Sequence, residues 1–220
     1  MLVTRSLVVA VLSGAFIASF GCSAGPEEVD EAAAGAVETG EETVPARERY
    51  RAVVVPEGLT WEEARSRAEA DGGHLVTITS ADENAQVLAL VAERAEIWAN
   101  YDGALIVDGE EAPLQVTIGP WIGLHQPSGS AEPDGGWVWV TGEALGYTNW
   151  SPVPNSDESE PNDNGGVEDH ANLFGPGLDD RSGRWNDMPN DPEADFSAAG
   201  MEFTGEVPSP RGYVVEFEQE

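Results

Sequence analysis

Helical periodicity in this chain ends near residue 98, and a set of short apolar runs follows it. Before that point, apolar residues recur at helical spacing in two stretches. After it, runs at 121–124, 137–140 and 213–217 are separated by Gly, Pro, Asn and Asp, which is typical of strands joined by loops. The chain is therefore expected to adopt an α+β fold, in which two helices precede short antiparallel strands.

Both expected helices carry a recognisable start. Thr60 with Glu63, and Ser80 with Glu83, form the Ser/Thr-x-x-Glu pattern of a capping box. The pair Gly72-Gly73 ends the first helix. Strands are expected at 50–55 and at 75–78, on either side of that helix.

The region 141–211 is irregular and too long for an ordinary connection between strands. Loops of this length in a compact domain are usually functional or wrongly assigned. We therefore expect the binding chemistry of the chain to lie here.

The charge of the chain excludes one class of partner. Acidic residues number 41 and basic residues 10, which gives a formal net charge of -31. Such a surface repels phosphates, so nucleic-acid binding is not expected. Cations are the natural partners of this surface, although much of the charge can serve solubility alone.

The N-terminal 48 residues are expected to lie outside the folded domain. Residues 1–21 have the basic start and apolar stretch of an export signal. Cys22 is the only cysteine, and its context resembles a bacterial lipobox, which predicts a lipidated protein exported to a bacterial outer membrane or cell surface. An ordinary secretory signal with an incidental cysteine is the alternative. Residues 22–48 are acidic and lack aromatic residues, so we expect a disordered tether before a domain at 49–220.

Several segments, in order, resemble the C-type lectin-like domain family. The resemblance covers roughly 49–219, and the sugar-binding and calcium-binding properties discussed below are what it implies. The matching segments are LTWEEA at 59–64, GGHLVTI at 72–78, WIGL at 121–124, WVWVTG at 137–142, EPN at 160–162, ED at 168–169, WND at 185–187 and YVVEF at 213–217.

The resemblance also shows what this chain lacks. Family members usually carry two disulfides, and the matching positions hold Ala68 with Val215 and His170 with Asn190. The first pair is expected to pack in the core. The second has no obvious replacement, so ion binding is expected to order the long loop. Residues 98–118 look like an insertion at a loop surface.

Five residues of the long loop and its neighbouring strand match the family's principal calcium ligands. Calcium takes six to eight oxygen ligands from carboxylates and amide carbonyls. The resemblance implies that the same five residues contact the sugar, because two neighbouring hydroxyls complete the calcium shell while Glu accepts and Asn donates hydrogen bonds. These residues are Glu160, Asn162, Glu168, Asn186 and Asp187.

The Glu160-Pro161-Asn162 order carries the specificity that the resemblance implies. In the family this Glu-Pro bond is cis and turns both flanking side chains toward one ion. The order resembles lectins that prefer mannose, N-acetylglucosamine or fucose-like hydroxyls. A glycan or glycoprotein is therefore the expected ligand.

A second, auxiliary calcium site is implied at Asp134, Asp163, Glu168 and Asp169. The remaining family carboxylate falls at Ser130, which departs from the pattern. An acidic protein places Asp and Glu in any loop, so spacing and family order rather than composition support both sites.

Two other functions compete with the lectin hypothesis. A protein-binding or adhesion module would keep the fold without recognising sugar. An enzyme is not expected, because no pair of carboxylates, no Ser-His-Asp context and no phosphate-binding Gly loop stands out. The tryptophans in the strand motifs are expected to lie in the core rather than to stack on sugars. The sequence does not define the oligomeric state.

Overall fold

The computed structural model describes residues 49–152, 159–177 and 181–218. The export signal at 1–21, the tether at 22–48 and Cys22 lie outside the described residues and stay predictions. All described residues belong to one compact unit. Within these ranges, no helix has both the length and the apolar character needed to cross a membrane.

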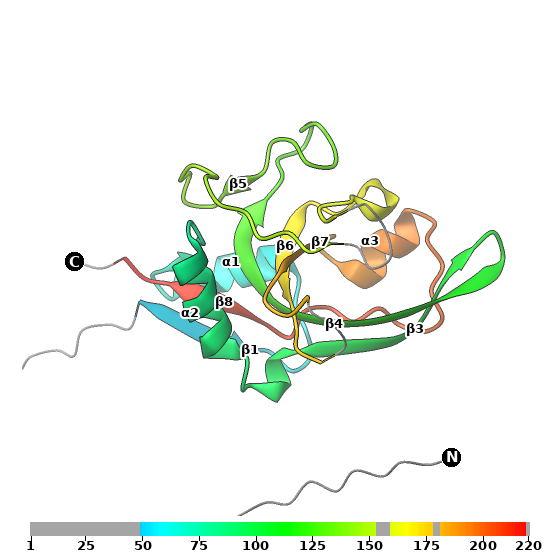
Figure 1. Cartoon of the computed structure of the whole chain (residues 1–220), viewed down its shortest axis with the longest axis horizontal. Coiled ribbons are helices and arrows are strands. Elements are labelled where there is room, and N and C mark those ends of the chain that lie inside the picture. The colour runs from blue at the N-terminus through cyan, green and yellow to red at the C-terminus, as the bar shows by residue number, and fades with distance from the viewer. Residues whose placement is uncertain (1–48, 153–158, 178–180, 219–220) are drawn as a thin grey trace, which may run out of the picture. The chain divides into compact units, whose positions relative to one another are not determined.

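The fold is α+β, as the sequence predicts, with one extended sheet and helices packed against it (Figure 1). Neighbouring strands follow the order β1-β8-β4-β6-β7, while β2 pairs with β8 and both β3 and β5 pair with β4. All pairings are antiparallel except that of β4 with β8, which makes the sheet mixed. The strands are β1 Tyr50–Val54, β2 His74–Leu75, β3 Ala99–Val107, β4 Glu110–His125, β5 Val138–Trp139, β6 His170–Phe174, β7 Trp185–Met188 and β8 Gly212–Glu216.

Helix α1 (Trp61–Ala70) begins with the predicted capping box. The Thr60 hydroxyl accepts from the Glu63 backbone N–H at 3.1 Å, and the Glu63 carboxylate accepts from the Thr60 N–H at 3.3 Å. Helix α2 (Ala81–Val91) has only half of the expected box. The Glu83 carboxylate instead accepts from the backbone N–H and the hydroxyl of Thr79, and it also forms an ion pair with the Arg49 guanidinium.

The segment 98–118, expected to be a loop insertion, forms most of a long hairpin of β3 and β4 that extends away from the body of the domain (Figure 1). The hairpin turns at Asp108-Gly109, where both residues have positive φ, 53° and 82°. A two-residue turn with positive φ at both positions matches the right-handed twist of its strands, and Asp-Gly is a preferred pair. The same strand β4 continues into the predicted 121–124 segment.

The region 141–211 is more regular than expected, because it contains β6, β7 and a third helix, α3 (Pro192–Ala198). Asp191 caps this helix by accepting from the Ala194 N–H at 3.3 Å, and Pro192 occupies its first turn. Both are typical helix-start residues. Two short 3₁₀ turns, Ala95–Ile97 and Asn164–Gly166, complete the described elements.

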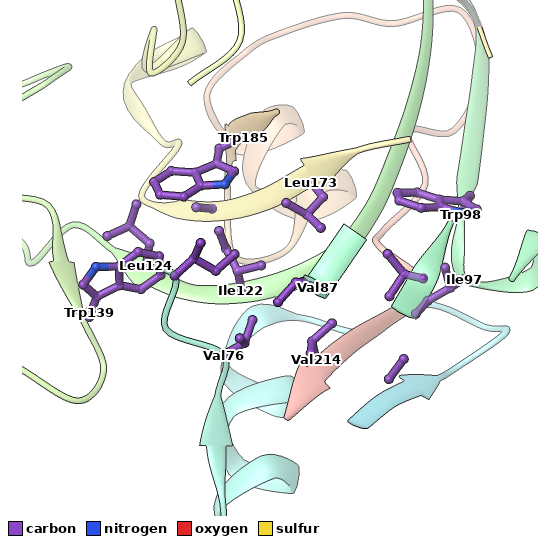
Figure 2. Close-up of a cluster of buried hydrophobic side chains, with 14 of the residues drawn as sticks. Val76, Val87, Ile97, Trp98, Ile122, Leu124, Trp139, Leu173, Trp185 and Val214 are labelled. Carbon is purple, nitrogen blue, oxygen red and sulfur yellow. The ribbon is translucent and has the colours of Figure 1, made fainter. Parts of the chain in front are cut away.

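The strand tryptophans lie in the core, as predicted. Trp121, Trp139 and Trp185 are at most 2% exposed and Trp137 is 5% exposed. Trp139 and Trp185 come from neighbouring parts of the sheet and pack edge to face, with ring centroids 5.5 Å apart (Figure 2). Trp150 is half-buried and contacts Trp185 at the rim of this cluster.

The positions of the two family disulfides are filled by noncovalent contacts. Ala68 and Val215 are fully buried in the same apolar cluster, which confirms the packing predicted for them. The second pair also has a replacement, contrary to expectation. His170 stacks on Trp61 with ring centroids 4.6 Å apart, and the Asn190 side chain accepts from the Glu62 N–H at 3.0 Å. Both residues therefore attach the long loop region to the start of α1.

Candidate functional site

The long loop and strand β7 bring the five predicted ligands together. Glu160, Asn162 and Glu168 lie on the loop between β5 and β6, while Asn186 and Asp187 lie on β7. The β6–β7 ladder pairs Ala171 with Asp187, and so places this strand beside the loop residues that immediately precede β6. All five side chains are buried or half-buried.

Asp187 fixes the loop at the centre of the site. One of its carboxylate oxygens, Oδ2, accepts from the backbone N–H groups of Asn162 at 2.9 Å and Asp163 at 2.8 Å. The Asn162 amide donates to the Glu160 carboxylate. The Glu160-Pro161 peptide bond is cis, in agreement with the resemblance. Hydrogen bonds to the Asp187 carboxylate thus attach the loop turn at 162–163 to strand β7.

The other two predicted ligands are also held by neighbouring groups. The Glu168 carboxylate accepts from the Asn164 backbone N–H at 2.6 Å. The Asn186 amide donates to Asn172 Oδ1 at 3.2 Å and to the Asp187 carbonyl at 2.7 Å. Hydrogen bonds within the protein therefore hold these side chains in position.

Three buried carboxylates lie close together at the site, and the pKa of each is raised, with burial as the largest cause. Burial, with the neighbouring charge of Asp187, raises the pKa of Glu160 to about 8. Burial, with the charge of Asp187, also raises the pKa of Glu168 well above its ordinary value. Burial raises the pKa of Asp187 to about 6 although backbone N–H groups oppose the shift. A bound cation would relieve this repulsion.

The donor set fits calcium. Asn162 Oδ1 and Asp187 Oδ1 are buried and have no hydrogen-bond partner. Buried polar atoms are normally paired. Two unpaired oxygens beside buried carboxylates therefore fit a bound cation as their partner. Over the described ranges, no three His, Cys, Asp or Glu side chains form a metal cage by themselves. The fit therefore depends on amide oxygens as well as carboxylates, the mixture that calcium takes.

The residues of the predicted auxiliary site are only partly brought together. Asp163 accepts from the Glu168 backbone N–H at 3.2 Å. Burial and the charge of Asp163 raise the pKa of Asp169. Burial and the charges of Asp163 and Asp169 also raise the pKa of Glu132, a residue that sequence reasoning missed. Asp134 is exposed on the same loop. The repeated Glu-Pro pair at 132–133, which is also cis, is the signal that could have drawn attention to Glu132.

Two histidines that are paired across β4 and β6 pack against Trp61. The ring centroids of His125 and His170 lie 5.0 Å and 4.6 Å from that of Trp61. Burial and the neighbouring His125 lower the pKa of His170 to about 3, and burial also lowers the pKa of His125. Burial therefore favours the neutral form of both rings, which pack against Trp61.

A family model described as the Lectin C-type domain matches residues 57–196. Mouse regenerating islet-derived protein 3-alpha is 35% identical over 85 residues, 38% of each chain. Rat asialoglycoprotein receptor 2 is 28% identical over 133 residues, 60% of this chain and 32% of the receptor. Human secretory phospholipase A2 receptor is 28% identical over 116 residues, 53% of this chain and 6% of the receptor. The chain thus spans well under two thirds of the length of these relatives.

Solved structures with a similar fold include two mammalian proteins. The cow C-type carbohydrate-recognition domain of CD23, in the presence of a GlcNAc2Man3 oligosaccharide, is 21% identical, with a TM-score of 0.44 over 79% of this chain and 91% of that chain. Human lithostathine is 19% identical, with a TM-score of 0.44 over 79% and 95%.

Proposed function

Because this chain belongs to the C-type lectin domain family, we propose that its domain is a calcium-dependent carbohydrate-binding module. The observation that carries the proposal is the pair of buried, unpaired oxygens, Asn162 Oδ1 and Asp187 Oδ1, beside carboxylates whose pKa values are raised. A bound calcium ion would compensate the negative charge at this site. It would also bind two neighbouring hydroxyls of a pyranose.

The protein side chains would supply the remaining contacts to the sugar. Carboxylate oxygens of Glu160 and Glu168 would accept hydrogen bonds from hydroxyl groups, and the Asn162 amide would donate one, whereas both amide hydrogens of Asn186 are used within the protein. A site of carboxylates alone would hold the ion but would lack donors for the hydroxyl oxygens. The Glu160-Pro161-Asn162 order favours mannose, N-acetylglucosamine or fucose-like sugars. A relative named asialoglycoprotein receptor supports a glycan or glycoprotein ligand.

We propose that this module lies outside the cell. The apolar N-terminus with Cys22 supports export and lipid anchoring to a bacterial membrane, and the acidic segment 22–48 would hold the domain away from it. The mass of the mature protein tests the anchor. A mature chain that starts at Cys22 with an added diacylglycerol agrees with the proposal, whereas an unmodified Cys22 contradicts it.

Thermal melting and a glycan array, each with calcium and with a chelator, test the binding function. We expect calcium to raise the melting temperature and to be required for glycan binding. Glu168→Gln should abolish both responses because it removes a buried carboxylate of the site. Glu57→Gln removes the same charge from an exposed turn and should preserve them. A wild-type protein with no calcium response in either assay would refute the proposal.

A protein-binding or adhesion module is the second candidate. The match to a receptor named for a protein, secretory phospholipase A2, favours it, and so does the added β3–β4 hairpin, which enlarges the surface near the site. Calcium stabilisation with a blank glycan array would select this candidate. Calcium-dependent glycan binding would reject it as the primary function.

A further inference from the structure

A cavity of about 210 Å³ lies between the predicted calcium ligands and the inner face of the β3–β4 hairpin. Four of the five predicted ligands line its polar end. The rest of the wall is mainly apolar. Its apolar side chains come from the β3–β4 hairpin, from α3 and from the segment after α3, and they include Leu105, Leu114, Val116, Phe196, Met201 and Phe203.

The hairpin has one polar and one apolar face, as its alternating side chains require. On the polar face, Gln115 donates to Asp102 at 2.7 Å, and the Thr117 hydroxyl donates to Asn100 at 2.7 Å. On the other face, Leu105, Leu114 and Val116 line the cavity and are only half-buried. These apolar side chains therefore line the cavity and keep some accessible surface, instead of being fully buried in a core.

Hydrogen bonds hold the far wall of the cavity in place. The Thr204 backbone N–H donates to the Ala104 carbonyl at 2.8 Å, and the Ala104 N–H donates to the Thr204 hydroxyl at 2.6 Å. Leu105 and Phe203 form the adjoining bridge between the two backbones. The segment after α3 is thus fastened to the hairpin, which keeps the apolar wall facing the ion site.

We propose that the ligand of this site is a saccharide with a compact apolar substituent, an aryl or short acyl group that enters the cavity. This inference rests on the proposed sugar-binding function and adds the class of sugar. Apolar walls with a few convergent polar groups are typical of small-molecule sites. A cavity of about 150 Å³ lined by apolar side chains binds benzene, so this one accommodates a single ring or a short chain. It is too small for a long lipid chain.

Calorimetry with matched glycosides tests the inference in the presence of calcium. The probes are methyl and phenyl α-mannopyranoside, with the two galactopyranosides as a second pair. Because burial of apolar surface favours binding, we expect the phenyl glycoside of the preferred sugar to bind at least about tenfold more tightly than the methyl glycoside. Equal affinities within the pair would overturn this inference and leave the proposed function intact. No calcium-dependent binding of any glycoside would refute the proposed function itself.

Two variants of the β3–β4 hairpin test whether the cavity causes the tighter binding of the phenyl glycoside. Val116→Phe adds a ring to the apolar wall of the cavity and should remove the phenyl advantage, so that the phenyl and methyl glycosides bind with equal affinity. Val107→Phe adds the same group at a position that is 49% exposed and outside the cavity lining, so the advantage should persist. If Val116→Phe does not fold, as judged by the absence of a cooperative melting transition, Leu114→Phe takes its place. A phenyl advantage that persists in the filled variant contradicts the inference.

Discussion

The calcium-free protein is expected to lose stability as the pH rises from about 4.5 to about 8. Burial and the charge of Asp187 raise the pKa of Glu160 from 4.5 to about 8 in the folded state. Across this window the folded state binds more protons than the unfolded state at this group, so the free energy of unfolding falls with increasing pH. Below about 4.5 both states are protonated and the effect is absent.

The size of the effect follows from the shift. At about 1.4 kcal/mol per pKa unit, Glu160 alone corresponds to about 5 kcal/mol. The shifts of Glu160 and Asp187 are not added, because protonation of one relieves the repulsion on the other. A domain of this size changes its melting temperature by about 2–4 °C per kcal/mol, so the melting temperature should fall by about 10 °C or more. Calcium should reverse this trend, since a bound cation favours the ionised carboxylates.

Differential scanning calorimetry across this pH window, with a chelator and with calcium, measures both slopes. The net charge of -31 also destabilises the folded state as carboxylates ionise, and a matched pair of variants separates the two causes. Glu160→Gln removes one of the three carboxylates with raised pKa values and should make the slope shallower, whereas Glu57→Gln, which removes an exposed charge, should leave it as steep as in the wild type. A flat or rising melting temperature in the chelated wild type, or equal slopes in the two variants, would refute the reasoning.

Three further substitutions test the scaffold by chemical denaturation. Thr60→Ala should cost about 1 kcal/mol, because the first N–H groups of α1 lose a cap; an unchanged stability would contradict this. Gly119→Ala should cost about 1–3 kcal/mol or prevent folding, because its methyl group would meet the Trp98 ring, and a neutral effect would show that the ring can move. Gly109→Ala meets no neighbouring atoms but has a φ of 82°, so it should cost only about 1 kcal/mol of backbone strain, with glycan binding unchanged.

Local signals predicted the elements that begin with distinctive residues. The capping box at Thr60 and the strand at 121–124 need no long-range information. The capping residue Asp191, with Pro192 after it, and the turn pair Asp108-Gly109 are equally local signals, yet α3 and the β3–β4 hairpin were not predicted. Both lie in segments where the resemblance indicates loops rather than regular elements.

The sequence predicts less of the candidate site than of the secondary structure. Spacing alone does not place the loop around 160–168 beside strand β7; that proximity depends on the β6–β7 ladder. Glu132 approaches Asp163 and Asp169 from a separate loop, so no local pattern assigns it to the acidic group. The apolar cavity depends on which hairpin face meets the segment after α3, which is a property of tertiary packing.

The contacts at the positions of the family's second disulfide change the role that is expected for calcium. The sequence left ion binding as the means of ordering the long loop, but His170 and Asn190 already attach that region to α1 through Trp61 and Glu62. These contacts lie at the ends of β6 and β7, whereas the buried carboxylates lie on the loop beside them. Repulsion among the carboxylates therefore acts on a loop whose base is fixed. Calcium binding should change the order of the ligand-binding turn much more than that of the strands, a difference that amide hydrogen exchange with and without calcium can measure. Equal protection changes in β6, β7 and the turn at 160–168 would show that the noncovalent contacts do not replace the second disulfide.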